Sequence, residues 1–202
     1  MTVMEVLCLS LAFILGSLPF SQLIAKRRGV DLRSVGSGNA GATNLARVLG
    51  YGAGATGLLL DAAKGAAAVG LARVILGAAV TPAVTAGTAV LAVAGHAFSP
   101  LLHFRGGKGV ATGAGAFAVL APRATLAALG VFAVVLALGR VVGLASVLAA
   151  LTLPVAAHVL GAQRAVTAAA ALVAALVILR HRDNLLRLVR GTEHRLGAGG
   201  DR

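Results

Sequence analysis

Charged residues are scarce in this chain and make up only 12% of its 202 residues. Soluble domains carry about 25%, so a water-soluble domain of this size is excluded, and charged disordered or coiled-coil segments are excluded with it. Tryptophan is absent and tyrosine occurs once, which leaves almost no aromatic belt for a membrane surface. The single cysteine, Cys8, excludes an internal disulfide.

Apolar residues dominate instead. They form 58% of the chain, and the mean hydropathy is +0.94, which predicts an integral membrane protein. The 18 basic residues outnumber the 6 acidic ones and give a net charge of +12. In a membrane protein this excess indicates cytoplasmic loops and anionic partners, such as lipid headgroups or phosphorylated substrates, rather than nucleic acid.

The apolar runs predict one all-α polytopic domain, 1–202, with seven transmembrane helices. A span needs roughly 17–25 apolar residues. The expected spans are 3–25, 53–78, 82–102, 110–121, 124–139, 141–160 and 165–179, of which the fourth, fifth and seventh are short. The first run carries Glu5 and has no basic segment before it, so we expect a transmembrane helix there rather than a signal peptide.

The basic residues predict how the spans are oriented. With seven spans, 14 lysines and arginines fall on the side of loop 26–50 and of the C-terminal tail, which includes Arg202. Arg123 and Arg164 fall on the opposite side, and Lys64 and Arg73 fall within a span. The positive-inside rule then places the N-terminus outside and the C-terminus in the cytoplasm. A single helix over 110–139 would put the basic tail outside, which argues for seven spans.

Polar chemistry is concentrated in three segments on the cytoplasmic side, which predicts an active site at that membrane face. The first segment runs from Val35 to Arg47 and combines small residues with Ser37, Asn39, Thr43 and Asn44. Small residues let backbone N–H groups approach an anion, and Arg47 adds charge. The segment contains a formal dinucleotide fingerprint, which we reject because it follows a membrane span rather than a strand. The alternative is a polar turn that caps a helix.

The second polar segment, 104–113, places Lys108 between glycines. It lacks the glycine spacing and the following Ser or Thr of a P-loop. Glycines around a lysine at the start of a span still suit a phosphate, because the helix N-terminus adds partial positive charge. The alternative is an ordinary basic cytoplasmic loop.

The third polar segment, 180–188, follows the last span. His181, Asn184 and Leu188 recur at a spacing that places them on one face of a helix. The alternative is that Arg182, Arg187 and Arg190 form a stripe on the lipid surface.

A few polar residues fall inside spans. Asp61 and Lys64 are three residues apart and can pair, which lets a membrane tolerate two charges, so we interpret them as structural. His96 fits a packing role as well as a functional one. His103, His158 and His194 show no ligand spacing, so we expect no metal site and no cofactor.

Together these segments resemble the acyl-phosphate:glycerol-3-phosphate acyltransferase family (PlsY), bacterial membrane enzymes that make lysophosphatidic acid. The matching strings are Gly36-Ser37-Gly38-Asn39-x-Gly41-Ala42-Thr43-Asn44 followed by Arg47, Asp61-x-x-Lys64-Gly65, Gly95-His96, Phe104-Arg105-Gly106-Gly107-Lys108-Gly109-Val110-Ala111-Thr112, and Arg180-His181-Arg182-x-Asn184-x-x-Arg187-Leu188 with Glu193 after it. Their order and spacing agree from Gly16 almost to the C-terminus. The chain departs from the family in its alanine-rich spans with few aromatic residues.

The resemblance implies a seven-helix enzyme of the bacterial inner membrane with its active site facing the cytoplasm. The enzyme would transfer an acyl group from acyl-phosphate to the 1-hydroxyl of sn-glycerol 3-phosphate and release phosphate, as a step of phospholipid synthesis. It would work beside a soluble enzyme that produces acyl-phosphate.

Candidate site residues follow from the chemistry and the resemblance together. The catalytic candidates are Ser37, Arg47, Lys108, His181 and Asn184. The phosphate-binding candidates are Gly38, Asn39, Thr43, Asn44, Gly106, Gly107, Gly109 and Thr112, and the supporting candidates are Asp61, Lys64, His96 and Glu193. Arg47 and Lys108 would neutralise the two substrate phosphates. Ser37 would orient a substrate rather than attack it, because no Ser-His-Asp grouping is present. Either a donor phosphate oxygen or His181 would take the hydroxyl proton.

Two functions from other classes compete with this one. A small transporter for phosphorylated metabolites would also use basic, glycine-rich loops, but the sequence shows no inverted repeat and no matched pair of broken helices. A non-catalytic lipid-binding scaffold would not need so polar a cluster of Ser, Asn, Thr and Arg.

Overall fold

The computed structural model describes residues 1–197, and Arg202, which we counted in the basic tail, lies outside them. All regular structure within these residues is helical. The α-helices are α1 (Val3–Ser17), α2 (Phe20–Lys26), α3 (Ala42–Leu49), α4 (Tyr51–Leu76), α5 (Pro82–Ala97), α6 (Val110–Leu120), α7 (Pro122–Gly139), α8 (Val142–Val159), α9 (Arg164–Arg180) and α10 (Arg182–Val189); two short 3₁₀ turns are η1 (Gly77–Ala79) and η2 (Pro100–Leu102).

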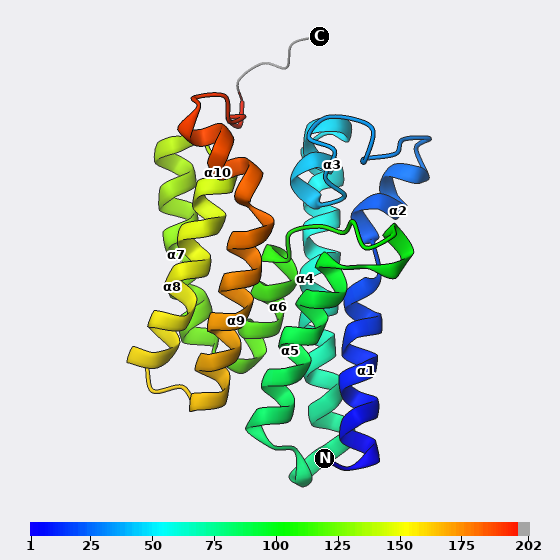
Figure 1. Ribbon diagram of the computed structural model, residues 1–202, viewed down its shortest axis with the longest axis vertical. Coiled ribbons are helices and arrows are strands. Elements are labelled where there is room, and N and C mark those ends of the chain that lie inside the picture. The colour runs from blue at the N-terminus through cyan, green and yellow to red at the C-terminus, as the bar shows by residue number, and fades with distance from the viewer. Residues whose placement is uncertain (198–202) are drawn as a thin grey trace.

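The long helices form a bundle along the longest axis of the molecule (Figure 1). Helix α5 packs against α1, α4, α6 and α9, while α7 and α8 pair with each other on one side. The short helices α2, α3 and α10 lie toward the end shown at the top, with α10 on the opposite side from α2, and α1 begins at the other end. The first and third polar segments, which lie on or next to α3 and α10, are therefore brought to the same end of the bundle.

A helical segment lies at each of the seven expected spans. Four segments are long and apolar enough by themselves to cross a membrane: Val3–Lys26, Pro82–Leu102, Pro122–Gly139 and Val142–Val159. Helices α9 and α10, bent by 55° at their junction, would make a fifth if they form one span. Helix α4 is longer but charged, with Asp61, Lys64 and Arg73 along it. Several spans are therefore clear, and the number seven stays a prediction.

The sequence predicted one transmembrane helix over 3–25. Val3–Lys26 is long and apolar enough for one span, but it is not one continuous helix. The run is divided into α1 and α2, and the break falls at Leu18 and Pro19. Proline has no N–H to continue the helix and disfavours helical backbone at the residue before it. The carbonyl of Leu18 instead accepts a hydrogen bond from the ammonium of Lys64 on α4, at 2.6 Å.

Helix α6 is short and tightly docked. Its 11 residues span about 17 Å, roughly half of a bilayer's hydrocarbon core. Gly115 on α6 and Gly65 on α4 lie against backbone atoms of the facing helix, so a side chain at either position would collide with Ala62 or Thr112. Small residues at such crossings let two backbones approach closely. The loop that carries Lys108 therefore leads directly into a short helix whose position is fixed by close contact with α4.

Candidate active site

A cavity of about 450 Å³ lies inside the bundle where the three polar segments meet. Its wall includes side chains from the loop before α3, from α3, from the start of α6, from the α9–α10 junction and from the segment after α10. The polar and charged residues that line it are Ser37, Asn39, Thr43, Asn44, Arg47, Asp61, His96, Lys108, Thr125, Ser146, His181, Asn184, Arg187, Glu193 and His194. They come mostly from loops and helix ends, so the chemistry is concentrated at one end of the bundle.

The middle parts of the helices supply an apolar wall. Leu58 of α4, Ala118 of α6, and Leu129 and Phe132 of α7 line the same cavity. A smaller apolar cavity of about 60 Å³ shares Leu129 and Phe132 and continues between α6, α7, α8 and α9. The site therefore offers a polar region and an adjoining apolar region.

The loop before α3 is shaped by the buried side chain of Asn44. Its amide nitrogen donates to the carbonyls of Leu32 and Val35, both at 3.0 Å, and its oxygen accepts the backbone N–H of Ser37 at 2.9 Å. The Arg47 guanidinium also reaches this oxygen, at 3.5 Å. Asn44 is therefore satisfied within the protein, and its effect is to present Ser37 and Arg47 at the cavity.

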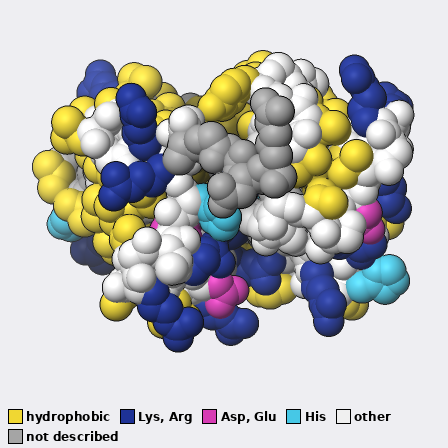
Figure 2. Space-filling view, turned by 90° about the horizontal axis from the view of Figure 1, so that it is seen from above, with side chains coloured by type: hydrophobic (Ala, Val, Ile, Leu, Met, Phe, Trp, Pro, Cys, Tyr) yellow, Lys and Arg dark blue, Asp and Glu magenta, His cyan; other side chains and the backbone are white. Residues whose placement is uncertain are grey.

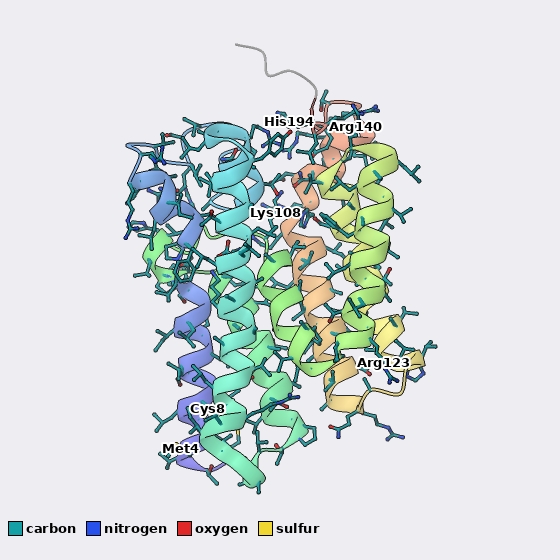
Figure 3. The ribbon with its side chains drawn as sticks, turned by 180° about the vertical axis from the view of Figure 1, so that it is seen from behind. Met4, Cys8, Lys108, Arg123, Arg140 and His194 are labelled. Atoms are coloured by element: carbon teal, nitrogen blue, oxygen red, sulfur yellow. The ribbon has the colours of Figure 1, made fainter. Side chains whose placement is uncertain are left out.

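The loop before α6 is tied to the end of α5. The N–H of Gly106 donates to the carbonyl of Ala97 at 3.1 Å, and that of Gly107 donates to the backbone carbonyl of His96 at 3.2 Å. A side chain at Gly107 would collide with the His96 ring. Lys108 follows directly, and its ammonium donates a hydrogen bond to the amide oxygen of Asn184 on α10. Figure 3 shows Lys108 deeper in the molecule than His194 and Arg140, which lie at the end of the bundle.

At the α9–α10 junction the chain turns instead of continuing as one helix. The sequence predicted that His181, Asn184 and Leu188 share one face of a helix. His181 instead lies between two helices, as the C-cap of α9 and the N-cap of α10, where the chain bends by 55°. Its ring Nδ1 is 2.7 Å from the carbonyl oxygen of Val177. Asn184 donates to Glu193, which also binds the guanidinium of Arg187 at 2.7 Å. The bend therefore brings Asn184 over the cavity, where Glu193 and Lys108 hold its amide from both sides.

Burial changes the acid–base behaviour of two groups at the site. Desolvation lowers the pKa of Lys108 to about 8, although the charge of Glu193 opposes this change. Desolvation, together with the charge of Lys108, also lowers the pKa of His181 to about 4. At pH 7, Lys108 is therefore a cation and His181 is neutral.

A buried polar cluster lies beneath these loops. Asp61 forms an ion pair with Lys64 at 2.8 Å and accepts a hydrogen bond from the Ser21 hydroxyl at 3.2 Å. The His96 ring nitrogen Nδ1 is 3.6 Å from the Asp61 carboxylate. This confirms the predicted Asp61–Lys64 pair and shows that His96 packs between that pair and the Gly107 turn.

The cations at the cavity are only partly neutralised. Asp61 pairs with Lys64, and Glu193 pairs with Arg187. Arg47 and Lys108 take part in no ion pair within residues 1–197. Figure 2 shows Lys and Arg side chains spread over this end of the molecule, with few acidic side chains among them. The cavity is therefore suited to groups that carry several negative charges.

Comparison with known proteins decides the family. Residues 6–191 match the family glycerol-3-phosphate acyltransferase. The chain belongs to this family. Glycerol-3-phosphate acyltransferase 1 of Deinococcus radiodurans is 43% identical to it over 197 residues, which cover 98% of each chain.

Two solved structures of PlsY, an integral membrane glycerol 3-phosphate acyltransferase, share its fold. The glycerol 3-phosphate form superposes with a TM-score of 0.91 at 37% identity and covers 96% of both chains. The lysophosphatidic acid form superposes with a TM-score of 0.88 at 36% identity and covers 96% of this chain and 95% of the other. This member of the glycerol-3-phosphate acyltransferase family is therefore an all-helical, multi-pass membrane protein.

Most of the site residues expected in this acyltransferase lie at the one cavity. Those that line it are Ser37, Asn39, Thr43, Asn44, Arg47, Asp61, His96, Lys108, Gly109, His181, Asn184 and Glu193. These residues are separated by up to 156 positions in the chain, and the structure brings them together (Ser37 to Glu193). Their roles stay predictions.

Four of the phosphate-binding candidates do not reach the cavity. The N–H groups of Gly106 and Gly107 are used in bonds to α5, so neither is free for a phosphate. Gly38 donates its N–H to the carbonyl of Val35 and closes a turn. Thr112 is fully buried against α4. Gly106 and Gly107 therefore serve close packing against α5, whereas Gly109 of the same segment lines the cavity.

Several residues at or near the site were not expected from the sequence. Ser146, Arg187 and His194 line the cavity, and Arg180 binds the glycine turn from outside it. Arg187 belongs to the strings that carry the family resemblance, which was a signal for it, although we also considered it part of a lipid stripe. Ser146 and His194 gave no signal in spacing or composition.

Proposed function

We propose that this protein transfers an acyl group from acyl-phosphate to the 1-hydroxyl of sn-glycerol 3-phosphate. The products would be lysophosphatidic acid and phosphate. The observation that carries the proposal is the cavity itself, in which Arg47 and Lys108, cations without an ion-pair partner in residues 1–197, adjoin an apolar wall. Family membership and the two PlsY structures, one described as a glycerol 3-phosphate form and one as a lysophosphatidic acid form, support the same substrates.

Two phosphates and one acyl chain are matched by three parts of the site. Arg47 and Lys108 provide cations for the phosphates of the acceptor and the donor, and charge-assisted hydrogen bonds are about twice as strong as neutral ones. The acyl chain lies along Leu129, Phe132 and the apolar extension between α6 and α9. This arrangement places the reacting carbonyl where the polar and apolar parts of the cavity meet.

The chemical step needs positioning more than a strong base. The oxygen of the 1-hydroxyl forms a bond to the acyl carbonyl carbon, and the bond from that carbon to the phosphate oxygen breaks. The hydroxyl proton passes to the departing phosphate. His181 is a poor base for this proton because its pKa is about 4, so the proposal favours the phosphate as proton acceptor. Lys108 stabilises the negative charge that develops on the carbonyl and phosphate oxygens.

Ser37 fits an orienting role. It lines the cavity in a turn fixed by Asn44. Within the described part of the chain, its hydroxyl is hydrogen-bonded to no histidine or lysine that would activate it as a nucleophile. We therefore propose direct transfer between two substrates that are bound together.

The charge distribution supports a cytoplasmic site and seven spans. Arg140 lies at the same end as His194 and the cavity, and Arg123 lies toward the opposite end (Figure 3). The positive-inside rule assigns the end with more basic residues to the cytoplasm. A soluble enzyme that makes acyl-phosphate would deliver its product to this face.

Release of phosphate tests the proposed function. Purified protein in a lipidic phase is given acyl-phosphate with and without glycerol 3-phosphate, and the acyl product is identified by mass spectrometry. We expect phosphate and lysophosphatidic acid in equal amounts, only when both substrates are present. No release would favour a transporter or a lipid scaffold, and release that does not depend on glycerol 3-phosphate would indicate a hydrolase.

A further inference from the structure

Arg180, at the last position of α9, binds the two glycines that precede Lys108. Its Nη2 donates to the carbonyl of Gly106 at 2.8 Å, and its Nε donates to the carbonyl of Gly107 at 3.2 Å. The guanidinium also lies over the Phe98 ring, 5.8 Å from its centre. Arg180 forms no ion pair with a carboxylate in residues 1–197. Its contacts are therefore directed at this turn.

The same two peptide groups are fixed from the other side by α5. Their N–H groups donate to the carbonyls of His96 and Ala97, while their C=O groups accept from Arg180. A planar guanidinium is suited to this task because two of its N–H groups point in nearly parallel directions. The turn is thus bonded to α5 on one side and to α9 on the other, which fixes its backbone conformation.

This turn determines where the backbone of Lys108 lies. Lys108 follows Gly107 directly, and its ammonium reaches Asn184, which lies four residues after Arg180. The α9–α10 junction therefore holds Lys108 at two points, its backbone through Arg180 and its ammonium through Asn184. Arg180 itself is not among the residues that line the cavity.

We infer that Arg180 is a positioning residue, which clamps the Gly106–Gly107 turn and so holds Lys108 at the phosphates of the substrates. That the phosphates belong to substrates rests on the proposed function. The contacts by which Arg180 holds the turn before Lys108 do not depend on it. A second effect follows from charge. Arg180 places a cation near Lys108 and helps to lower the pKa of the Lys108 ammonium.

Arg180→Gln and Arg182→Gln make a matched pair for the test. Both remove one positive charge at the α9–α10 junction, but the side chain of Arg182 is 80% exposed and touches none of these groups. For Arg180→Gln we expect kcat to fall about ten-fold or more, with a smaller change in KM, because an interaction that positions Lys108 for the transition state is lost. Arg180→Lys should recover part of the activity, since an ammonium reaches one carbonyl but cannot bridge both. Arg182→Gln should change kcat by less than about two-fold.

A measurement without turnover separates this inference from the proposed function. The chain has three lysines, of which Lys26 is exposed and Lys64 is buried in the bundle. The rate of labelling of Lys108 by a small amine-reactive reagent, measured against pH by mass spectrometry with Lys26 as internal reference, reports its apparent pKa. We expect this pKa to rise in Arg180→Gln, which removes the cation, and to stay close to that of the unmodified protein in Arg180→Lys, which keeps it, and in Arg182→Gln.

The outcomes are distinct. An unchanged kcat and an unchanged Lys108 labelling profile in Arg180→Gln would overturn the inference, as would equal losses in the Arg180 and Arg182 variants. If no acyl transfer is found in the unmodified protein, the proposed function fails, but a changed labelling rate of Lys108 in Arg180→Lys, which keeps the charge and loses one of the two hydrogen bonds, would still support the clamp.

Discussion

The ammonium of Lys108 donates a hydrogen bond to the amide oxygen of Asn184, and the amide nitrogen of Asn184 donates to Glu193. The amide therefore separates a cation from a carboxylate that would otherwise neutralise it. Glu193 is held by Arg187 as well, at 2.7 Å. Lys108 keeps its charge for a ligand, while Glu193 acts on it through space.

Glu193→Gln should move the alkaline limit of activity to lower pH. The charge of Glu193 raises the pKa of Lys108 against the effect of burial, so its removal favours the neutral amine. The pH dependence of kcat/KM, which reports the free enzyme, should therefore begin to fall below the value of about 8 expected for the unmodified protein. Asp183→Asn is the control, since its side chain is 69% exposed, pairs with Arg182, and is not among the groups that shift the pKa of Lys108. Identical profiles for the two variants would contradict the role assigned to Glu193.

Replacing Lys108 should affect both rate and pH dependence. Lys108→Ala removes a charge-assisted bond worth roughly 1.5–3 kcal/mol, so we expect a loss of about ten-fold or more in kcat/KM. Lys108→Arg should stay below full activity, because the narrow turn is shaped for a compact ammonium. Its residual activity should not fall above pH 8, since a guanidinium stays protonated. Unchanged kinetics in Lys108→Ala would mean that the loop has only a topological role.

Ser37 should form no acyl-enzyme. We expect no burst of phosphate when acyl-phosphate is added without glycerol 3-phosphate, and kinetics that require both substrates together. Ser37→Ala should reduce activity strongly while the protein stays folded. A stoichiometric burst, with an acyl ester on Ser37 detected by mass spectrometry, would overturn direct transfer.

The buried Asp61–Lys64 pair should be needed for stability. Removing one member leaves an uncompensated charge in the bundle, which costs about 3–5 kcal/mol. We therefore expect Lys64→Met and Asp61→Asn each to lower the thermal unfolding midpoint in detergent, and the double variant to lose less than the sum. Arg73→Gln, at an exposed position of the same helix, is the control. Additive losses in the double variant would show that the two residues act separately.

Cysteine labelling tests the topology. A cysteine next to Arg164 should react with an impermeant reagent added from outside intact cells, and one next to Arg190 should not, once Cys8 is replaced. The basic residues motivate this result, because the positive-inside rule places the Arg190 end in the cytoplasm. The reverse pattern would exclude the seven-span topology.

Hydropathy predicted the helices of this protein well because membrane spans are defined by length and apolar content, both of which are local. The predicted span 141–160, for example, is α8, Val142–Val159. The break at Pro19 was not predicted, although proline disfavours a continuous helix. The run is apolar on both sides of the proline, so hydropathy alone indicated one helix. What makes the break tolerable is Lys64, 46 positions from Leu18, and no local pattern shows such a partner.

The sequence predicted which residues form the site better than it predicted the hydrogen bonds that they make. Composition and the family resemblance indicated Ser37, Arg47, Lys108 and Asn184, all of which line one cavity. The sequence could not show that the N–H groups of Gly106 and Gly107 are already bonded to α5, or that Arg180 binds their carbonyls, because these partners depend on how α5 and α9 pack. Glycine next to lysine is compatible with both anion binding and close packing, and only the tertiary structure distinguishes the two.

The break between α1 and α2 has a consequence for how the protein enters the membrane. If the first span were inserted alone, the carbonyl of Leu18 would lack the donor that Lys64 provides, and Lys64 would later enter with Asp61 of its own helix as its partner but without the Leu18 carbonyl. Each of these two groups satisfies the other, as the 2.6 Å bond shows. We therefore expect the first two spans to be inserted together, as a helical hairpin. The hydrogen bond between Lys64 and the break at Leu18 would then determine the order in which the spans enter the membrane.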